Sequence, residues 1–214
     1  MPEVTRIKIG TGNCYLLRHN GAAILVDAAA PGGEEELLAR LQQLGTPPET
    51  LRLLFLTHGH FDHVGAAALL QSRGVPVALH PGDAGRMGPM QPDGKAGQVL
   101  LKIAMQGAQR PQRYTPDVLL QDGQRLDEYG IPALVVAQPG HSAGSVCLFT
   151  DDGDLLCGDV FMNFLSPHTA HIAEDFPTYH QSLQKLKALP FHKIWPGHGA
   201  PFAPARLAGW PATS

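Results

Sequence analysis

Hydrophobic residues along this chain occur in short continuous runs, typical of buried strands, and in helically spaced stripes, typical of amphipathic helices. Residues 14–28 contain two apolar runs separated by Asn20-Gly21, which predicts a β-hairpin. Residues 32–45 have three acids in their first turn, carry leucines at helical spacing and end at Gly45, which predicts a helix. The apolar run 51–57 predicts a strand that is buried on both faces.

The same patterns continue to the end of the chain, with one irregular stretch. Helices are expected over 63–74 and 178–189, and strands over 75–79, 117–121, 133–138, 145–150, 154–158 and 192–195. Residues 81–116 break this rhythm with Pro, Gly and Met around one short helical pattern at 97–106. We therefore expect one layered α/β domain over residues 1–214, with an insertion at 81–116.

Composition narrows the class of protein. Hydrophobic residues make up 43% of the chain, enough for a substantial core, and the formal net charge is -3. That slight acidity argues against a nucleic-acid partner, which usually meets a basic face. No stretch approaches the roughly 20 apolar residues of a membrane span, so no membrane partner is expected. Three widely spaced cysteines form no disulfide framework, and a cytoplasmic location is expected by default.

Metal-binding residue types follow the ends of several predicted strands. Ligand sites in α/β folds collect at the carboxyl ends of strands, so we expect these side chains to meet at one edge. The candidates are His58, His60, Asp62, His63, His141, Asp159 and His198. A single histidine after a strand would be ordinary, but the HxHxDH spacing at 58–63 is specific, and the later positions strengthen it.

The ligand types indicate the metal. Imidazole and carboxylate groups suit Zn, Fe or Mn, and the lack of ligating thiolates argues against a closed structural zinc site. Seven ligands are too many for one tetrahedral ion. They would suit two ions about 3.5–4 Å apart, if one carboxylate bridges them.

On these motifs the chain resembles the metallo-β-lactamase-fold hydrolases of the glyoxalase II-like (hydroxyacylglutathione hydrolase-like) branch. The matching segments span nearly the whole chain and are "NCYLL", "ILVDA", "THGHFDHVG", "PGHSAGSVCLF", "LLCGDVF" and "IWPGHGAPF". The resemblance implies a four-layer αβ/βα sandwich, with two internal sheets, outer helices and a binuclear metal site along one edge.

The resemblance also implies a role for each ligand. Asp159 would bridge the two ions, which are expected to be Zn2+, with Fe or Mn as alternatives. Asp27 matches a position that braces the ligands from behind, although an ordinary acid at a strand end is the alternative. The implied ligand sets are His58, His60 and His141 for one ion, and Asp62, His63 and His198 for the other.

An acidic bridge resembles the thioesterase, lactonase and phosphodiester-cleaving members. True β-lactamases of this fold tend to place a thiolate or another residue at the position of Asp159, and Cys157 is interpreted as core. A water shared by two cations would lose its proton near neutral pH and attack an ester or thioester carbonyl. One ion would hold the developing oxyanion. Asp62 is expected to orient the nucleophile or shuttle a proton, so Asp62 and Asp159 are the predicted catalytic residues.

Two other reactions are open alternatives. Persulfide dioxygenases of this fold resemble the same motif set but use one iron, held by the equivalents of His58, His141 and Asp159. The other alternative is a phosphodiesterase or nuclease. Net acidity and the absence of a long basic arm count against that candidate.

The substrate is expected to be a small molecule, and the oligomeric state is open. Full-length glyoxalase II enzymes hold glutathione with a helical C-terminal region. Only the segment 199–214 follows His198, which puts glutathione recognition in doubt. The insertion 81–116 could form a mildly cationic lid that suits an anionic substrate, or a solvated excursion that packs on its own domain. The residues behind that hypothesis are Arg86, Lys95, Lys102, Arg110 and Arg113, with Met87, Met90 and Met105. The segment 162–171 is a candidate for another wall of the site.

Overall fold

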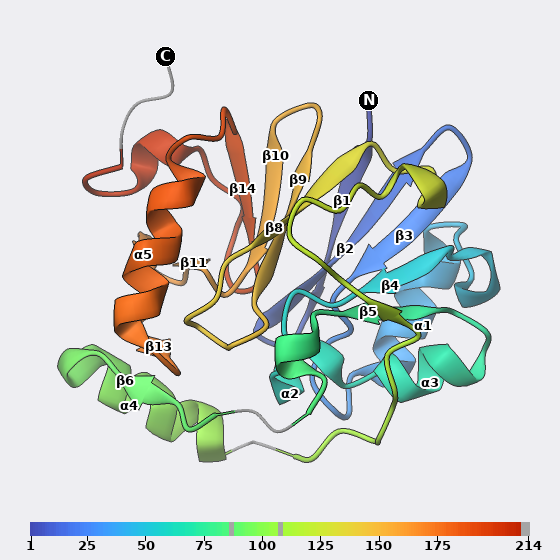
Figure 1. The fold of residues 1–214 in the computed structure, drawn as a ribbon. Helices are drawn as coiled ribbons and strands as arrows, with labels where there is room; N and C mark the ends of the chain where they lie inside the picture. The colour runs from blue at the N-terminus through green and yellow to red at the C-terminus, as the bar shows by residue number, and fades with distance from the viewer. Residues whose placement is uncertain (86–87, 107–108, 211–214) are drawn as a thin grey trace.

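The computed structural model describes residues 1–85, 88–106 and 109–210. Two β-sheets face each other, and helices cover their outer sides (Figure 1). This arrangement confirms the predicted four-layer αβ/βα sandwich. Arg86 and Met87 of the predicted insertion lie outside the described residues.

The first sheet has six strands. Pairing is antiparallel from β1 to β3 and parallel from β3 to β7. In sheet order the strands are β1 (Glu3–Ile9), β2 (Gly12–His19), β3 (Ala22–Val26), β4 (Leu53–Phe55), β5 (Val77–Leu79) and β7 (Val118–Leu119). Asn20 and Gly21 both have positive φ, as a tight hairpin turn requires, and they join β2 to β3 as predicted.

The second sheet has four strands. β10 pairs in parallel with β14 and antiparallel with β9, which in turn pairs antiparallel with β8. Its strands are β14 (Lys193–Pro196), β10 (Asp154–Gly158), β9 (Val146–Thr150) and β8 (Ala133–Ala137). Two further strand pairs lie outside both sheets: β11 (Phe161–Asn163) with β12 (Pro167–Thr169), and β13 (Ile172–Ala173) with β6 (Gln91–Pro92).

Five α-helices and four short 3-10 helices occur in the described residues. The α-helices are α1 (Glu34–Gln43), α2 (Phe61–Val64), α3 (Ala67–Ser72), α4 (Gly94–Gln106) and α5 (Phe176–Leu186). The 3-10 helices are η1 (Pro48–Thr50), η2 (Pro81–Asp83), η3 (Asp127–Tyr129) and η4 (Pro204–Arg206). None of these helices combines the length and the apolar character needed to cross a bilayer.

Successive side chains along each strand point to opposite faces of the sheet, and this divides the core into layers. On β2, Leu16 packs outward toward Leu37 of α1, while Tyr15 and Leu17 point inward to the second sheet. Successive strand residues face opposite sides, so both faces of β2 are apolar and buried. Deleting such a side chain, for example by Leu16→Ala, should cost about 2–5 kcal/mol of stability.

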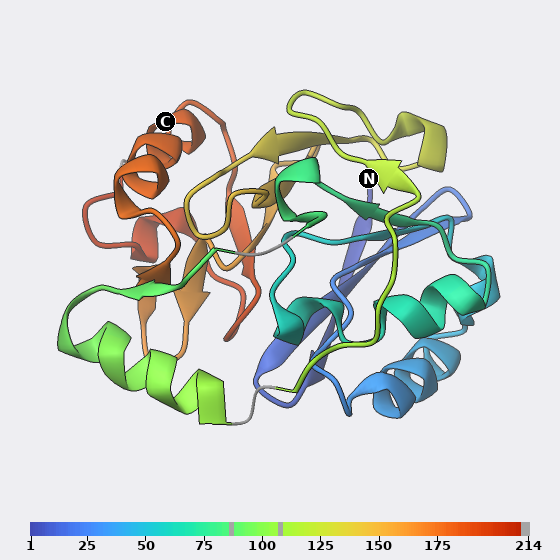
Figure 2. The same cartoon turned by 60° about the horizontal axis from the view of Figure 1, so that its bottom comes forward.

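Helix α4 stands apart from this packing. It lies beside β6 and β13, away from the two main sheets, and Figure 2 turns this edge of the molecule toward the viewer. Gly97 is the only fully buried residue among those of α4. The helical pattern predicted at 97–106 is therefore present, but the helix has little of the burial that normally stabilises one.

Candidate metal centre

The structure brings all seven predicted ligand residues together at one edge of the sandwich. They come from the segments that follow β4, β8, β10 and β14, and two of them, Asp62 and His63, lie in the short helix α2. Within each of three overlapping groups, the possible ligand atoms lie within 4.8 Å of one another. The groups are His58, His60 and His141; His58, His63 and Asp159; and Asp62, His63 and His198.

Asp159 lies between the two implied ligand sets. Its Oδ1 is 3.3 Å from His63 Nε2, and its Oδ2 is 3.5 Å from His198 Nε2 and 3.6 Å from His141 Nε2. One carboxylate thus faces histidines of both sets. That is the placement a carboxylate needs to bridge two cations.

Protein groups behind the histidines orient four of the rings. His63 Nδ1 donates to Asp27 Oδ2 at 2.8 Å, and His58 Nδ1 lies 3.0 Å from the Thr57 hydroxyl. The Nδ1 atoms of His141 and His198 donate to the carbonyls of Ile172 and Thr11, at 2.8 and 3.0 Å. Such contacts turn Nε2 of each ring toward the centre, where a metal ion would bind.

Several atoms at the centre have no hydrogen-bond partner although they are buried. They include Nε2 of His58, Nε2 of His63 and Oδ1 of Asp159. Buried polar atoms are almost always paired in folded proteins. A divalent cation between these atoms would satisfy them, so the residues present fit the metal ions that the resemblance implies.

The first ligand set has the protonation state that metal binding requires. Burial lowers the pKa of His58 well below its ordinary value, and it lowers the pKa of His141 as well. Burial, together with the neighbouring His141 ring, lowers the pKa of His60 to about 3. These three imidazoles are therefore neutral at pH 7, and neutral imidazole is the ligating form.

The carboxylates of Asp62, in the second ligand set, and of the bridging Asp159 are ionised. Burial opposes this, but His63 and His198 lower the pKa of Asp62 to about 2 and hold that of Asp159 well below its usual range. Burial likewise opposes protonation of the two histidines, yet nearby carboxylates, Asp159 above all, raise the pKa of both. The two acids thus offer acceptor-only oxygens to a cation.

Asp27 supports the centre from behind, as the resemblance implied. It is buried, and its carboxylate accepts hydrogen bonds from the backbone N–H and the hydroxyl of Thr57 in addition to His63. Its φ of 61° is unusual for a residue other than glycine. The hydrogen bonds offset that local strain and hold Thr57 and His63 in place.

Asp83 forms a second brace, which sequence reasoning missed. Its carboxylate is buried and accepts hydrogen bonds from Gly59 N at 2.8 Å, Ser142 Oγ at 2.6 Å and Gly144 N at 2.6 Å. It therefore ties the loop of His58 and His60 to the loop of His141. Its place shortly after β5, at the same end of the sheet as the ligand loops, was the available signal.

Gly197 allows the last ligand loop to approach the centre. A Cβ atom at this position would lie 2.3 Å from Asp159 Oδ1 and 2.6 Å from His63 Cε1. Both atoms belong to proposed ligands, so a larger residue would displace them. The glycine before His198 is needed for space.

Cys157 is a core residue, as predicted. It packs with Cys147 and Leu155 in the buried cluster that lies against α5. Burial raises the pKa of its thiol, which keeps it protonated and a poor metal ligand. Among the described residues, no cysteine belongs to the groups that could hold a metal ion.

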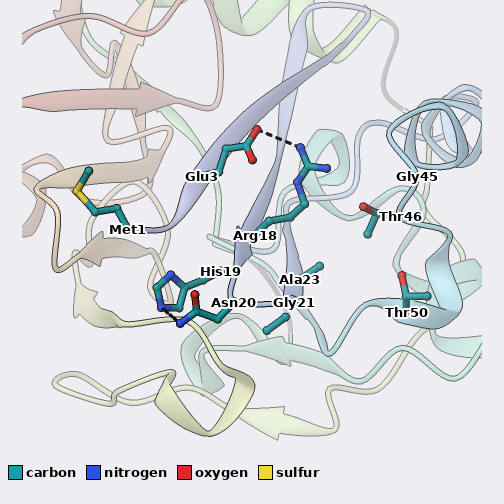
Figure 3. Close-up of a pocket in the computed structure, with 11 residues that line it drawn as sticks. Met1, Glu3, Arg18, His19, Asn20, Gly21, Ala23, Gly45, Thr46 and Thr50 are labelled. Carbon is teal, nitrogen blue, oxygen red and sulfur yellow. Dashed lines mark hydrogen bonds and ion pairs between the residues drawn. The ribbon is translucent and has the colours of Figure 1, made fainter.

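A separate hollow of about 480 Å³ lies at the end of β1 and β2 that is farther from the metal centre (Figure 3). Arg18 and Thr46 are among its lining residues, and Arg18 pairs with Glu3 at 3.1 Å. Glu3 begins β1, whereas the far end of that strand pair reaches His198 through Gly12. This hollow is thus roughly the length of β1, about 20 Å, from the metal centre.

Known proteins share this sequence and this fold. Residues 7–198 match the family described as the metallo-beta-lactamase superfamily. The probable metallo-hydrolase YflN of Bacillus subtilis is 31% identical over an alignment 208 positions long, and the match covers 83% of this chain and 75% of YflN. A hydroxyacylglutathione hydrolase of Thermosynechococcus vestitus is 31% identical over an alignment 203 positions long, and the match covers 91% of this chain and 67% of that enzyme.

Solved structures agree with the sequence comparison. The crystal structure of TTHA1623 in a di-iron-bound form is 28% identical, with a TM-score of 0.68 and 94% of each chain covered. These findings confirm the resemblance to glyoxalase II-like proteins that the sequence motifs indicated. With a family match over most of its length and the ligand loops at the expected edge, the chain belongs to the metallo-beta-lactamase superfamily.

Proposed function

We propose that this protein is a binuclear metal-dependent hydrolase that cleaves a thioester, or a lactone or other ester. The position of Asp159, between two sets of buried ligands, carries the proposal. The similarity to hydroxyacylglutathione hydrolases, which are metallo-hydrolases of this superfamily, supports the reaction class.

The two metal ions would be held by the ligand sets already described, with Asp159 shared between them. When bound, such ions supply a water nucleophile at neutral pH and polarise a carbonyl oxygen. Zn2+ is the proposed metal, and Fe or Mn is compatible with the same ligands.

Asp62 is the more exposed of the two acids that line the cavity. Its side chain is 24% exposed, compared with 7% for Asp159, and both line the cavity beside the centre. Asp62 Oδ2 also lies 3.2 Å from His198 Nε2, which holds the carboxylate in one orientation. Asp62 is therefore placed to accept a hydrogen bond from the attacking water and so to orient it.

The residues around the site favour a thioester over an ester, because a thioester has a thiolate leaving group. Among the described residues that line the cavity, His171 is the one titratable residue that is not a proposed ligand. Burial and the neighbouring His168 lower its pKa, so it is neutral at pH 7 and a weak acid for a leaving alkoxide. A thiolate needs little help from a proton donor, so thioesters are the preferred class.

A substrate screen on protein of measured metal content tests this function. We expect hydrolysis of thioesters, with or without oxygen, at rates above those for lactones, a chromogenic β-lactam and a phosphodiester. Chelation should abolish the activity, and added Zn2+ should restore it. Oxygen-dependent turnover of a persulfide with one iron per chain would instead assign the dioxygenase reaction.

His60→Ala and His180→Ala form a matched pair for this experiment. His60 belongs to the proposed first ligand set, whereas His180 is an exposed residue of α5. We expect His60→Ala to lose activity and bound metal while it keeps its circular dichroism spectrum. His180→Ala should behave as the parent protein does. Full activity in His60→Ala would contradict the proposed function.

A further inference from the structure

A cavity of about 410 Å³ opens directly beside the metal centre, within the usual size of a small-molecule site. Asp62, Asp159 and His198 of the centre form part of its wall. The opposite wall comes from α4 and from the segment around β11 and β13. The large apolar side chains that line it are Phe61, Leu100, Ile103, Met162, Phe164 and Ile172.

The α4 wall presents one helix face to the cavity. Leu100, Ile103 and Ala104 are three and four residues apart, so they share a face. Lys95 and Lys102 lie on the opposite side of the helix by the same periodicity, and neither lines the cavity. No Lys or Arg is part of the cavity wall within 1–85, 88–106 and 109–210.

Apolar side chains in this cavity are exposed to water. Ile103 is 61% exposed, and Phe164, which stacks on the ring of His198 at 5.4 Å between centroids, is 46% exposed. Covering exposed apolar surface around a concave site with an apolar ligand group is favourable, because it removes that surface from water. The wall next to the scissile bond therefore favours an apolar group over a charged one.

Close backbone packing holds α4 at this position. A Cβ atom on Gly97 would lie 2.3 Å from the carbonyl oxygen of His171, and the Asp93 N–H donates to the same oxygen at 2.7 Å. Ile172, the next residue, uses its carbonyl to orient His141. The apolar wall and a proposed ligand thus rest on two adjacent residues, His171 and Ile172, at the start of β13.

From these observations we propose that the substrate carries a neutral aliphatic acyl chain of medium length, which binds between α4 and Phe164. The inference rests on the proposed hydrolase function. It replaces the expectation of a cationic lid over an anionic substrate with an apolar wall over an uncharged one.

A chain-length series tests the proposal. Acetyl, butanoyl and hexanoyl thioesters of N-acetylcysteamine are neutral and differ only in their methylene groups. We expect kcat/KM to rise about tenfold from acetyl to hexanoyl, since a fully buried methylene gives roughly fourfold and a half-open cavity gives less. Equal rates along the series, or faster cleavage of a glutathione thioester than of the hexanoyl compound, would overturn the inference.

Two variants of α4 assign the effect to the helix face. Ile103 and Met105 are both 61% exposed, but only Ile103 lines the cavity. Ile103→Gln should remove most of the preference for hexanoyl over acetyl thioesters, because it replaces apolar surface by an amide. Met105→Gln should leave both rates unchanged. An equal effect of both variants would contradict the assignment.

A binding measurement separates this inference from the function on which it rests. Hexanamide and acetamide are neutral amides that can be titrated by ligand-observed NMR against metal-loaded protein. Preferential binding of hexanamide, lost in Ile103→Gln, supports the cavity even if no thioester is cleaved. Thioester hydrolysis without such a preference would overturn the inference and leave the hydrolase function intact.

Discussion

The metal centre and helix α4 border the same cavity but are held in opposite ways. At the centre, the ligand segments after β4, β8 and β14 are braced by buried hydrogen bonds to Asp27, Asp83 or backbone carbonyls. Helix α4 buries one residue, Gly97, and leaves Ile103 and other apolar side chains exposed. Rigid bracing suits groups that must keep their geometry, whereas a lightly packed wall can change its side chains without disturbing the chemistry.

The largest effect should come from breaking the centre itself. Asp159→Asn removes a negative charge from between the two ligand sets, so we expect loss of bound metal and a fall in activity beyond the 10–100-fold typical of supporting residues. Asp154→Asn changes an acid at the start of β10, the strand that Asp159 follows, and should have no such effect. Metal analysis and thioester hydrolysis measure both; two tightly bound ions in Asp159→Asn would argue against a bridging role.

Weakening a brace should have an intermediate effect. Asp83→Asn puts an amide N–H against the donors Gly59 N or Gly144 N, so we expect a loss of about 1–3 kcal/mol of stability. Metal affinity should fall by about 10–100-fold, because the loops of His60 and His141 lose their tie. Denaturant unfolding and competition with a chelator measure the two quantities. Asp93→Asn, at an exposed position, is the control, and unchanged metal affinity in Asp83→Asn would show that this brace is dispensable.

Displacing helix α4 should change the selectivity between acyl chains and leave the hydrolysis step itself unchanged. Gly97→Ala places a methyl group against the His171 carbonyl, so α4 must shift. We expect the preference for hexanoyl over acetyl thioesters to fall by about two- to fivefold through lost apolar contact, with little change for acetyl. Steady-state kinetics on both substrates would measure this. A similar loss on both would mean that α4 also positions the reacting groups.

The smallest effect is expected from thiol modification. Burial raises the pKa of Cys147 and of Cys157, and neither is accessible, so native protein should resist alkylation at neutral pH. Mass spectrometry after iodoacetamide treatment should show unmodified Cys157 together with full activity. Modification in the native state, with loss of activity, would place a thiol at the centre after all.

Local patterns predicted most of the regular elements. The Asn20-Gly21 hairpin and the helix at 32–45 were both predicted, since turn chemistry and leucine spacing act over a few residues. Strand β1 and the short pairs β11–β12 and β6–β13 were not, because their sequences lack a clear apolar period. The predicted helix at 63–74 is divided between α2 and α3, on either side of Gly65 and Ala66.

The sequence by itself determined the fold family and the seven residues that meet at the centre, because an HxHxDH cluster and strand-end motifs are local and specific. Tertiary structure alone decided that Asp83 ties two ligand loops together and that Gly197 leaves room for Asp159. It also decided which face of α4 borders the cavity. These features depend on distances between segments far apart in the chain, and no periodicity within one segment encodes such distances.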